Sequence, residues 1–312
     1  MSRIESIFLG AASEKILQMS RLVMISAAGN MALIVFLILF VMPAGAAAKN
    51  YNSYAIFYGA EIDTKKMSHF DLIIVDPKAK VDIPELHCKN TEVFAYLSLG
   101  EINKAAPEYE KFNAGGIIVK ENPNWPGSFY IDADSELWRN YILNEAVPAL
   151  AAGGYDGIFL DTLDSPAVIN DGFFGFYKNG TPAVCEIIRK IRELNPKLGL
   201  MANNFEEHAD EIGNYVNAFN VESLFCTYNF RSRKYERCDA KYSDKRVKRL
   251  QKLKKDYNVQ IFVTDYAANS NYRSVRRLYD KIKRCGFVPY VSEISLVKLN
   301  RHVLNFAKRA KK

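Results

Sequence analysis

Eight short apolar segments that alternate with amphipathic helical patterns predict an α/β fold, a single (β/α)8 TIM barrel. Most of the segments are apolar almost throughout, as parallel strands buried on both faces are. They extend over roughly 260 residues, the usual size of such a barrel. A doubly wound open sheet is the competing fold. The even number of strands and the lack of a glycine-rich loop after the first one argue against it.

The chain opens with a predicted leader over residues 1–48. Scattered basic residues are followed by an apolar run (MALIVFLILFVM, 31–42) and then by small residues up to Ala48, which is the order of an export signal. We expect cleavage after Ala46 or Ala48. If it stays uncleaved, the apolar stretch extended back to Leu22 is long enough to tether the chain to a membrane. In both cases we expect a secreted or periplasmic protein, in the second case anchored in the inner membrane.

The remaining elements follow in order along the chain. Between the strands, Thr181 and Pro182 predict the start of one helix, and Ser270 the start of another that ends at Gly286. The basic run within 241–255 predicts a helix with a solvated outer face. The segment 102–134 is long for one connection and predicts a packed insertion at the barrel mouth. The predicted strands occupy residues 54–60, 70–77, 91–100, 156–162, 198–204, 216–223, 259–267 and 287–293.

These elements give three regions: the leader (1–48), the barrel domain (49–297) and a basic C-terminal tail (298–312). The net charge of +7 is concentrated in that tail and in the basic helix, without a nucleic-acid motif, so we expect no nucleic-acid partner. We expect a monomer. The five cysteines form no CxxC pair or zinc-ligand spacing, and Cys226 with Cys238 is the nearest pair for a disulfide in an exported protein.

Carboxylates end two of the apolar strands. In (β/α)8 barrels the catalytic groups lie at the carboxyl ends of the strands. Asp161 ends GIFLD and Glu222 ends another apolar strand, where a carboxylate is costly to bury without a role or a partner. Cleavage of a glycosidic bond needs two such groups, so we predict Asp161 and Glu222 as the catalytic pair. Asp164, which also fits a turn or helix cap, is the alternative for the aspartate. The sequence leaves open whether the reaction retains or inverts the anomeric configuration.

Further polar and aromatic residues are expected at the same rim, where aromatic rings would stack on sugars. The predicted substrate-binding residues are Tyr58, Asp76, Tyr96, Glu101, Asp164, Asn204, Tyr228, Asp265 and Tyr290.

Seven segments carry a family resemblance: FDLIIVDP, AYLSLGEIN, NPNWPGSFYIDA, GGYDGIFLDTLDS, MANN, NVES and VTDYA, within about residues 70 to 267. In this order the chain resembles glycoside hydrolase family 114, the endo-α-1,4-polygalactosaminidase family, and most closely the hydrolase domain of Pel-type exopolysaccharide proteins. The resemblance implies a hydrolase that cuts polymers of galactosamine and N-acetylgalactosamine without a metal or organic cofactor. It also implies a catalytic pair formed by the aspartate of the fourth strand and the glutamate of the sixth, in this sequence Asp161 and Glu222.

Two other functions are compatible with the sequence. A non-catalytic barrel that binds polysaccharide during export or assembly would tolerate loss of either carboxylate. A structural or partner-binding envelope protein is favoured only if the segment 102–134 closes the barrel mouth.

Overall fold

The eight predicted strands form one parallel sheet in the computed structural model, which describes residues 49–169 and 180–311. Along the sheet the strands follow one another in chain order, and the first lies against the last. The phenol of Tyr290 donates to the carbonyl of Ile56 (3.0 Å) across that junction. The (β/α)8 barrel is thereby confirmed. Its strands are β1 (Tyr54–Phe57), β2 (Leu72–Val75), β3 (Glu92–Ser98), β7 (Gly157–Asp161), β8 (Gly199–Asn203), β9 (Ala218–Glu222), β12 (Gln260–Tyr266) and β13 (Val288–Ser292).

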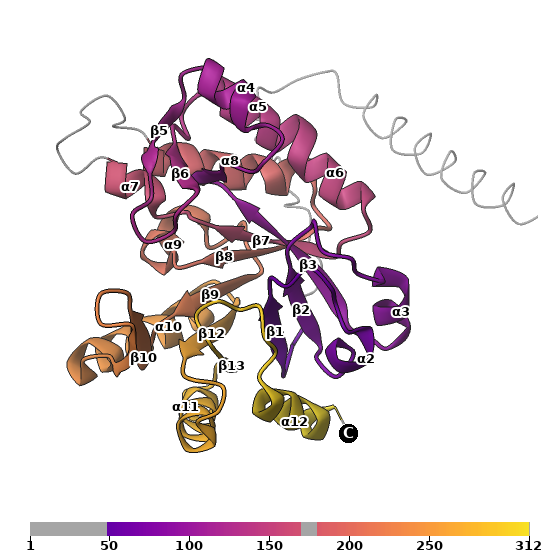
Figure 1. Cartoon of the computed structure of the whole chain (residues 1–312), viewed down its shortest axis with the longest axis vertical. Coiled ribbons are helices and arrows are strands. Elements are labelled where there is room, and N and C mark those ends of the chain that lie inside the picture. The colour runs from indigo at the N-terminus through magenta and orange to yellow at the C-terminus, as the bar shows by residue number, and fades with distance from the viewer. Residues whose placement is uncertain (1–48, 170–179, 312) are drawn as a thin grey trace, which may run out of the picture. The chain divides into compact units, whose positions relative to one another are not determined.

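Helices surround this sheet (Figure 1). The longer helices cover the outside of the strands with apolar faces, because their buried residues recur at helical spacing. One long helix follows the insertion, with a π-helical turn over Ile142–Ala146 between its two α-helical parts. The helices are α2 (Thr64–Met67), α3 (Ile83–Cys88), α5 (Glu136–Tyr141), α6 (Val147–Ala152), α7 (Ser165–Ile169), α8 (Gly180–Leu194), α9 (Ala209–Ile212), α10 (Ala240–Asp256), α11 (Tyr272–Arg284) and α12 (Arg301–Ala310).

Two predicted helix starts are wrong, by two residues at α8 and by one residue at α11. The helix α8 already includes Gly180, so Thr181 lies inside it and does not cap it. The cap of α11 is Asn271 rather than Ser270, and its side chain accepts a hydrogen bond from the amide of Ser274 (3.1 Å). Asparagine caps a helix as well as serine does, so a neighbouring pair of such residues leaves the boundary open. The predicted end is right, since Gly286 has a left-handed backbone (φ 83°).

At the carboxyl ends of two strands the chain forms additional structure, here called excursions, before it continues into the next helix. The predicted insertion after β3 is a three-stranded antiparallel sheet of β4 (Glu101–Asn103), β5 (Ile118–Glu121) and β6 (Ser128–Ile131), together with α4 (Tyr109–Ala114). The second excursion, after β9, is a hairpin of β10 (Cys226–Asn229) and β11 (Lys234–Arg237) that was not predicted from the sequence. The edge-to-face rings of Trp125 and Phe230 bring the two excursions into contact, with centroids 5.4 Å apart.

The segment expected as a basic tail is part of the folded barrel. Its helix α12 buries Val303, Leu304 and Ala307. Beyond the helix, the ammonium group of Lys311 donates to the carbonyls of Ser68 and Phe70 (3.0 and 2.8 Å) near the start of β2. The apolar face of α12 thus completes the ring of helices, while the polar side chains of this helix lie outward.

The predicted leader lies outside the described residues. Within 49–169 and 180–311, the structure contains no helix whose length and hydropathy suit a membrane span.

Candidate active site

Three neighbouring strands end in polar residues that contact one another. Asp161, Asn203 and Glu222 are the last residues of β7, β8 and β9. The side-chain nitrogen of Asn203 donates to both acids, at 2.7 Å to Oδ1 of Asp161 and 2.8 Å to Oε1 of Glu222. One nitrogen therefore holds two carboxyl groups together, and the two oxygens cannot lie farther apart than the sum of those distances.

The orientation of the Asn203 amide is fixed from inside the barrel. Its oxygen accepts a hydrogen bond from Nδ2 of Asn220 (2.7 Å), so its nitrogen faces the carboxyl groups. The oxygen of Asn220 in turn accepts from the phenol of Tyr54 (2.8 Å) and the hydroxyl of Thr264 (3.1 Å). All three of these supporting side chains are buried, and a buried polar network whose members are all bonded holds one geometry.

Tyrosines complete the surroundings of both acids. The phenol of Tyr266 donates to Oε2 of Glu222 (2.7 Å). Tyr96 hydrogen-bonds to Asp161, and its ring packs edge-to-face against Tyr58 with centroids 5.2 Å apart. Both acids are thus held by neutral donors.

Burial shifts the titration of this pair. The pKa of Glu222 is raised to about 6, first by burial and then by the charge of Asp161. Burial also raises the pKa of Asp161, against the opposing effect of hydrogen bonds from Asn203, the backbone of Thr162 and Tyr96. Two acids that share one donor titrate as a coupled pair, in which the first proton is lost more readily than the second. Glu222 can therefore hold a proton up to about pH 6.

Three other predicted rim acids have different surroundings. Glu101 is buried and accepts from Asn122 (3.0 Å), Ser128 (2.6 Å) and Ser165 (2.6 Å), so it ties the insertion to the start of α7. The side chain of Asp76 accepts a hydrogen bond from the backbone amide of Lys78 (2.8 Å), two residues farther along the same turn. Asp164 lies three residues beyond Asp161 with its side chain partly open to solvent; the protein atoms packed around its carboxyl group, and then the charge of Asp161, raise its pKa.

Four predicted substrate contacts need correction or a different role. Tyr290 is fully buried in the core, because it lies in the middle of β13 and not at its end. Asp265 is fully buried and accepts from the amides of Phe225 and Cys226 at the start of the hairpin. The side-chain oxygen of Asn204 accepts from the backbone amide of Glu222 (2.8 Å).

Tyr228 is half-buried on β10, where its ring contacts those of Phe230 and Tyr235. The structure thus gathers Asp161, Glu222, Tyr58 and Tyr96, whereas the hairpin holds Tyr228 among its own aromatic side chains.

Asn203 and Tyr266 are the site residues that the predicted set lacked. Asn203 is the last residue of β8, the position that Asp161 and Glu222 occupy in β7 and β9, whereas the predicted strand extends one residue farther, to Asn204. Tyr266 is likewise the last residue of β12.

The cysteines are single thiols that lie outside the site. Cys226 and Cys238, the nearest pair for a disulfide, are free, and burial raises the pKa of each to about 11. Among the described residues no group of three or more His, Cys, Asp or Glu side chains is arranged to hold a metal ion.

Solved structures share this fold. The glycoside hydrolase domain of PelA from Pseudomonas aeruginosa superimposes with a TM-score of 0.72 at 25% identity, over 80% of this chain and 98% of that domain. Ega3 from Aspergillus fumigatus, solved in complex with galactosamine, has a TM-score of 0.62 at 13% identity, over 78% of this chain and 92% of its own.

Sequence comparison identifies the family. An uncharacterized protein of Deinococcus radiodurans is 23% identical over 267 residues, which cover 82% of this chain and 84% of that protein. The model of glycoside hydrolase family GH114 matches residues 41–309, nearly the whole chain, and so confirms the resemblance seen in the sequence segments. The chain belongs to glycoside hydrolase family GH114 and is a glycoside hydrolase.

Proposed function

We propose that this hydrolase cleaves α-1,4-linked polymers of galactosamine and N-acetylgalactosamine, with Asp161 and Glu222 as its catalytic pair. The observation that carries the proposal is the single amide nitrogen of Asn203 that holds both carboxyl groups. Family membership supports the reaction class, and Ega3, which shares the fold, was solved with galactosamine.

The electrostatics of the site suit an amino sugar. Asp161 and Glu222 are bonded to neutral amide and phenol donors, and neither forms an ion pair among the described residues. An unacetylated galactosamine unit carries an ammonium group, which is attracted by the remaining negative charge and by the exposed Asp164. A polymer that carries only carboxylates would be repelled by the same groups.

The separation of the acids favours retention of configuration. Carboxyl groups roughly 5–5.5 Å apart are typical of retaining glycosidases, and those roughly 6.5–9.5 Å apart are typical of inverting ones. Because both acids contact one nitrogen, their bonded oxygens lie no more than 5.5 Å apart, which is short of the range typical of inverting enzymes. Asp161 is then close enough to attack the anomeric carbon directly, without an intervening water.

The proton assignment follows from the surroundings of each acid. Glu222, with its pKa raised to about 6, protonates the leaving glycosidic oxygen while Asp161 forms a covalent bond to the anomeric carbon. Glu222, now ionised, removes a proton from water, and the hydroxide releases the sugar from Asp161. Three donors favour ionised Asp161, which suits a nucleophile.

The test incubates the chain without residues 1–48 with a panel of purified polysaccharides. Mass spectrometry identifies the fragments, and NMR identifies which anomer of the product is released before mutarotation. We expect fragments from a partly deacetylated galactosamine polymer, with retained configuration, and none after Asp161→Asn or Glu222→Gln. Product release by Glu222→Gln at the wild-type rate would exclude this mechanism. Binding of the polymer without any cleavage by the wild type would favour the non-catalytic barrel instead.

The place of action proposed for this enzyme is outside the cytoplasm, since residues 1–48 carry the pattern of an export signal. Fractionation of cells that express the full chain tests this. Recovery of the protein in the cytoplasmic fraction would contradict it, and a mature mass that still includes the leader would indicate a membrane anchor.

A further inference from the structure

The chain turns sharply just after Glu222. Ser223 has a left-handed backbone (φ 55°), a conformation that residues other than glycine adopt rarely. Such a backbone is strained and persists only where its surroundings fix it. The same conformation follows the other two strand ends of the site, at Thr162 (φ 58°) and Asn204 (φ 48°). Something must therefore hold the backbone at Glu222 in place.

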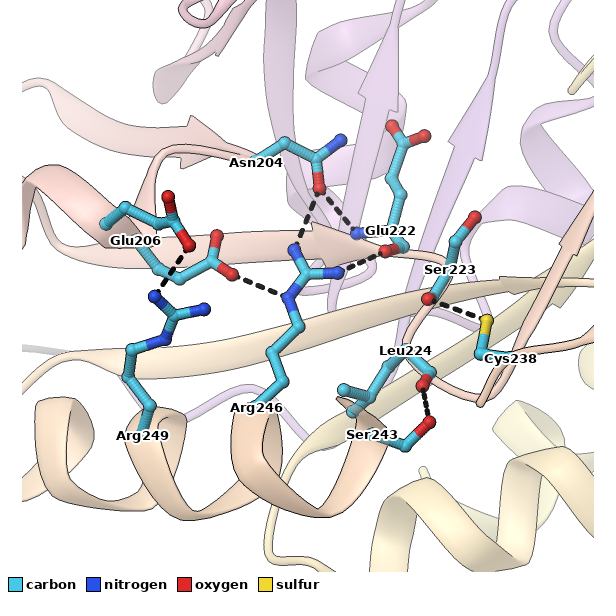
Figure 2. Close-up of polar contacts among 10 residues, drawn as sticks. Asn204, Glu206, Glu222, Ser223, Leu224, Cys238, Ser243, Arg246 and Arg249 are labelled. Atoms are coloured by element: carbon cyan, nitrogen blue, oxygen red, sulfur yellow. Dashed lines mark hydrogen bonds and ion pairs between the residues drawn. The ribbon is translucent and has the colours of Figure 1, made fainter. Parts of the chain in front are cut away.

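Side chains from outside the parallel sheet hold this backbone in place. Three consecutive backbone carbonyls, beginning with that of Glu222, each accept a hydrogen bond from a side chain (Figure 2). Two of the donors lie one turn apart on α10 and the third follows the hairpin. The pairs are Arg246 to Glu222 (2.8 Å), Cys238 to Ser223 (3.1 Å) and Ser243 to Leu224 (2.7 Å).

Arg246 is the central member of this network. Its Nη1 donates to the carbonyl of Glu222, and its Nη2 lies 3.4 Å from the side-chain oxygen of Asn204. That same oxygen accepts from the backbone amide of Glu222 (2.8 Å). Both backbone polar groups of Glu222 are thereby linked to one guanidinium group, directly on the carbonyl side and through Asn204 on the amide side, as Figure 2 shows.

The charge of Arg246 is neutralised on its other side. Its Nε donates to Glu206 at 2.6 Å, and the two side chains are only 9% and 3% exposed. The carboxyl group of Glu222 points away from the guanidinium group toward Asn203 and Tyr266. Arg246 therefore contacts the backbone of this residue and leaves its carboxyl group free for chemistry.

We propose that Arg246 is a positioning residue that sets the backbone of Glu222, and through it the distance between the Glu222 and Asp161 carboxyl groups. This inference rests on the proposed function, because it assigns Glu222 a catalytic role. Arginine is required because its planar fork reaches Glu206, Asn204 and the carbonyl of Glu222 in three directions, which a lysine ammonium on a flexible stem does not.

The central experiment compares Arg246→Lys with the wild type. The lysine keeps a positive charge beside the buried Glu206 but loses the fork, so we expect a folded protein whose kcat falls about 10- to 100-fold while KM changes less than about threefold. The matched control is Arg249→Met, which removes an ion pair with Glu207 (2.7 Å) at a half-exposed position one turn along α10. It should leave kcat unchanged.

A loss of folding is separated from a loss of positioning by a double variant. Arg246→Met leaves Glu206 buried without a partner and is expected to destabilise the protein strongly. Glu206→Gln combined with Arg246→Met removes both charges and should recover much of the thermal stability, with kcat still low. If kcat recovers together with stability, Arg246 has only a structural role and the proposal is overturned.

A second measurement does not need substrate. NMR of protein with ¹³C-labelled glutamate carboxyl groups, assigned with Glu222→Gln, follows the pKa of Glu222 directly. In Arg246→Lys we expect this pKa to move toward its ordinary value as the carboxyl group leaves Asp161. An unchanged pKa together with unchanged kcat would refute the proposal. If the wild type cleaves no polymer and the pKa still moves, the positioning role stands and the proposed function fails.

Discussion

The two ends of the barrel both gather carboxylates but neutralise them differently. At the amino ends of the strands, beside a cavity of about 460 Å³, Asp156 accepts from the amide of Val93 (2.8 Å) and hydrogen-bonds to the His87 ring (2.8 Å). Glu92 pairs there with Lys49. At the carboxyl ends, Asp161 and Glu222 lie together with an amide and phenols, and no cation pairs with either among the described residues.

This difference indicates which end of the barrel can carry out catalysis. At the amino ends, Glu92 has the cationic partner Lys49, and Asp156 accepts from a backbone amide and contacts the His87 ring. Burial raises the pKa of both Asp161 and Glu222, and such perturbed groups are typical of functional sites. The cavity at the amino ends is no candidate for the active site, because the acidic groups that line it already have partners. Paired variants at the two ends of the barrel test this contrast.

The largest effect is expected from neutralising one acid at each end. Glu222→Gln should lower kcat/KM about 10²- to 10⁴-fold, because the proposed general acid is lost. Glu92→Gln is the matched variant at the amino ends and should leave kcat/KM within about twofold, with at most about 1 kcal/mol lost in the free energy of unfolding. Steady-state kinetics and urea denaturation measure both. Equal kinetic losses would remove the functional distinction between the two ends.

Removal of the shared amide comes next. Asn203→Ala should lower kcat about 10²-fold, because the two acids are no longer held at one separation. It should also raise the apparent pKa of Glu222 further, since a hydrogen bond that favours the ionised form is lost. The pH dependence of kcat reports the shift. Asn217→Ala, which removes an acceptor of the Leu200 amide (2.9 Å) at the amino ends, is the control and should reduce stability without changing that profile.

A smaller effect concerns stability and pH. The pKa of Glu222 is raised to about 6 in the folded state, above its ordinary value of 4.5. The folded protein therefore binds this proton more tightly than the unfolded chain, and the free energy of unfolding falls as pH rises through about 6. Glu222→Gln removes this penalty. Its stability relative to wild type should increase by on the order of 1–2 kcal/mol between about pH 4 and pH 7.5, and a pH-independent difference in denaturation midpoints would contradict the burial argument.

The smallest effect is expected at the amino ends. Asp156→Asn keeps the size of the side chain but weakens its bonds to the Val93 amide and the His87 ring, which should cost about 1 kcal/mol of stability. The kcat value and its pH dependence should not change. A changed pH–rate profile would show that the amino ends contribute to catalysis.

Much of the barrel could be predicted because its signals are local. Every strand of the sheet falls inside a predicted segment, since an apolar run between turn residues specifies a buried parallel strand. The hairpin of β10 and β11 was not predicted from the sequence. Its strands are short and mostly polar, and its position depends on the buried Asp265, which is 40 residues away in sequence from the Phe225 amide that it binds.

The order of the strands, and the place of Asp161 and Glu222 at the ends of two of them, can be read from the sequence, because the period of a strand and the position of its last residue are local properties. Three features depend on the folded chain: which asparagine bridges the acids, the burial of Tyr290 and Asp265, and the inward position of Arg246 on a basic helix. The physical reason is that a polar side chain can be buried only where distant residues supply its partners. In this barrel Asn220 and Glu206 are those partners, and no local pattern indicates them.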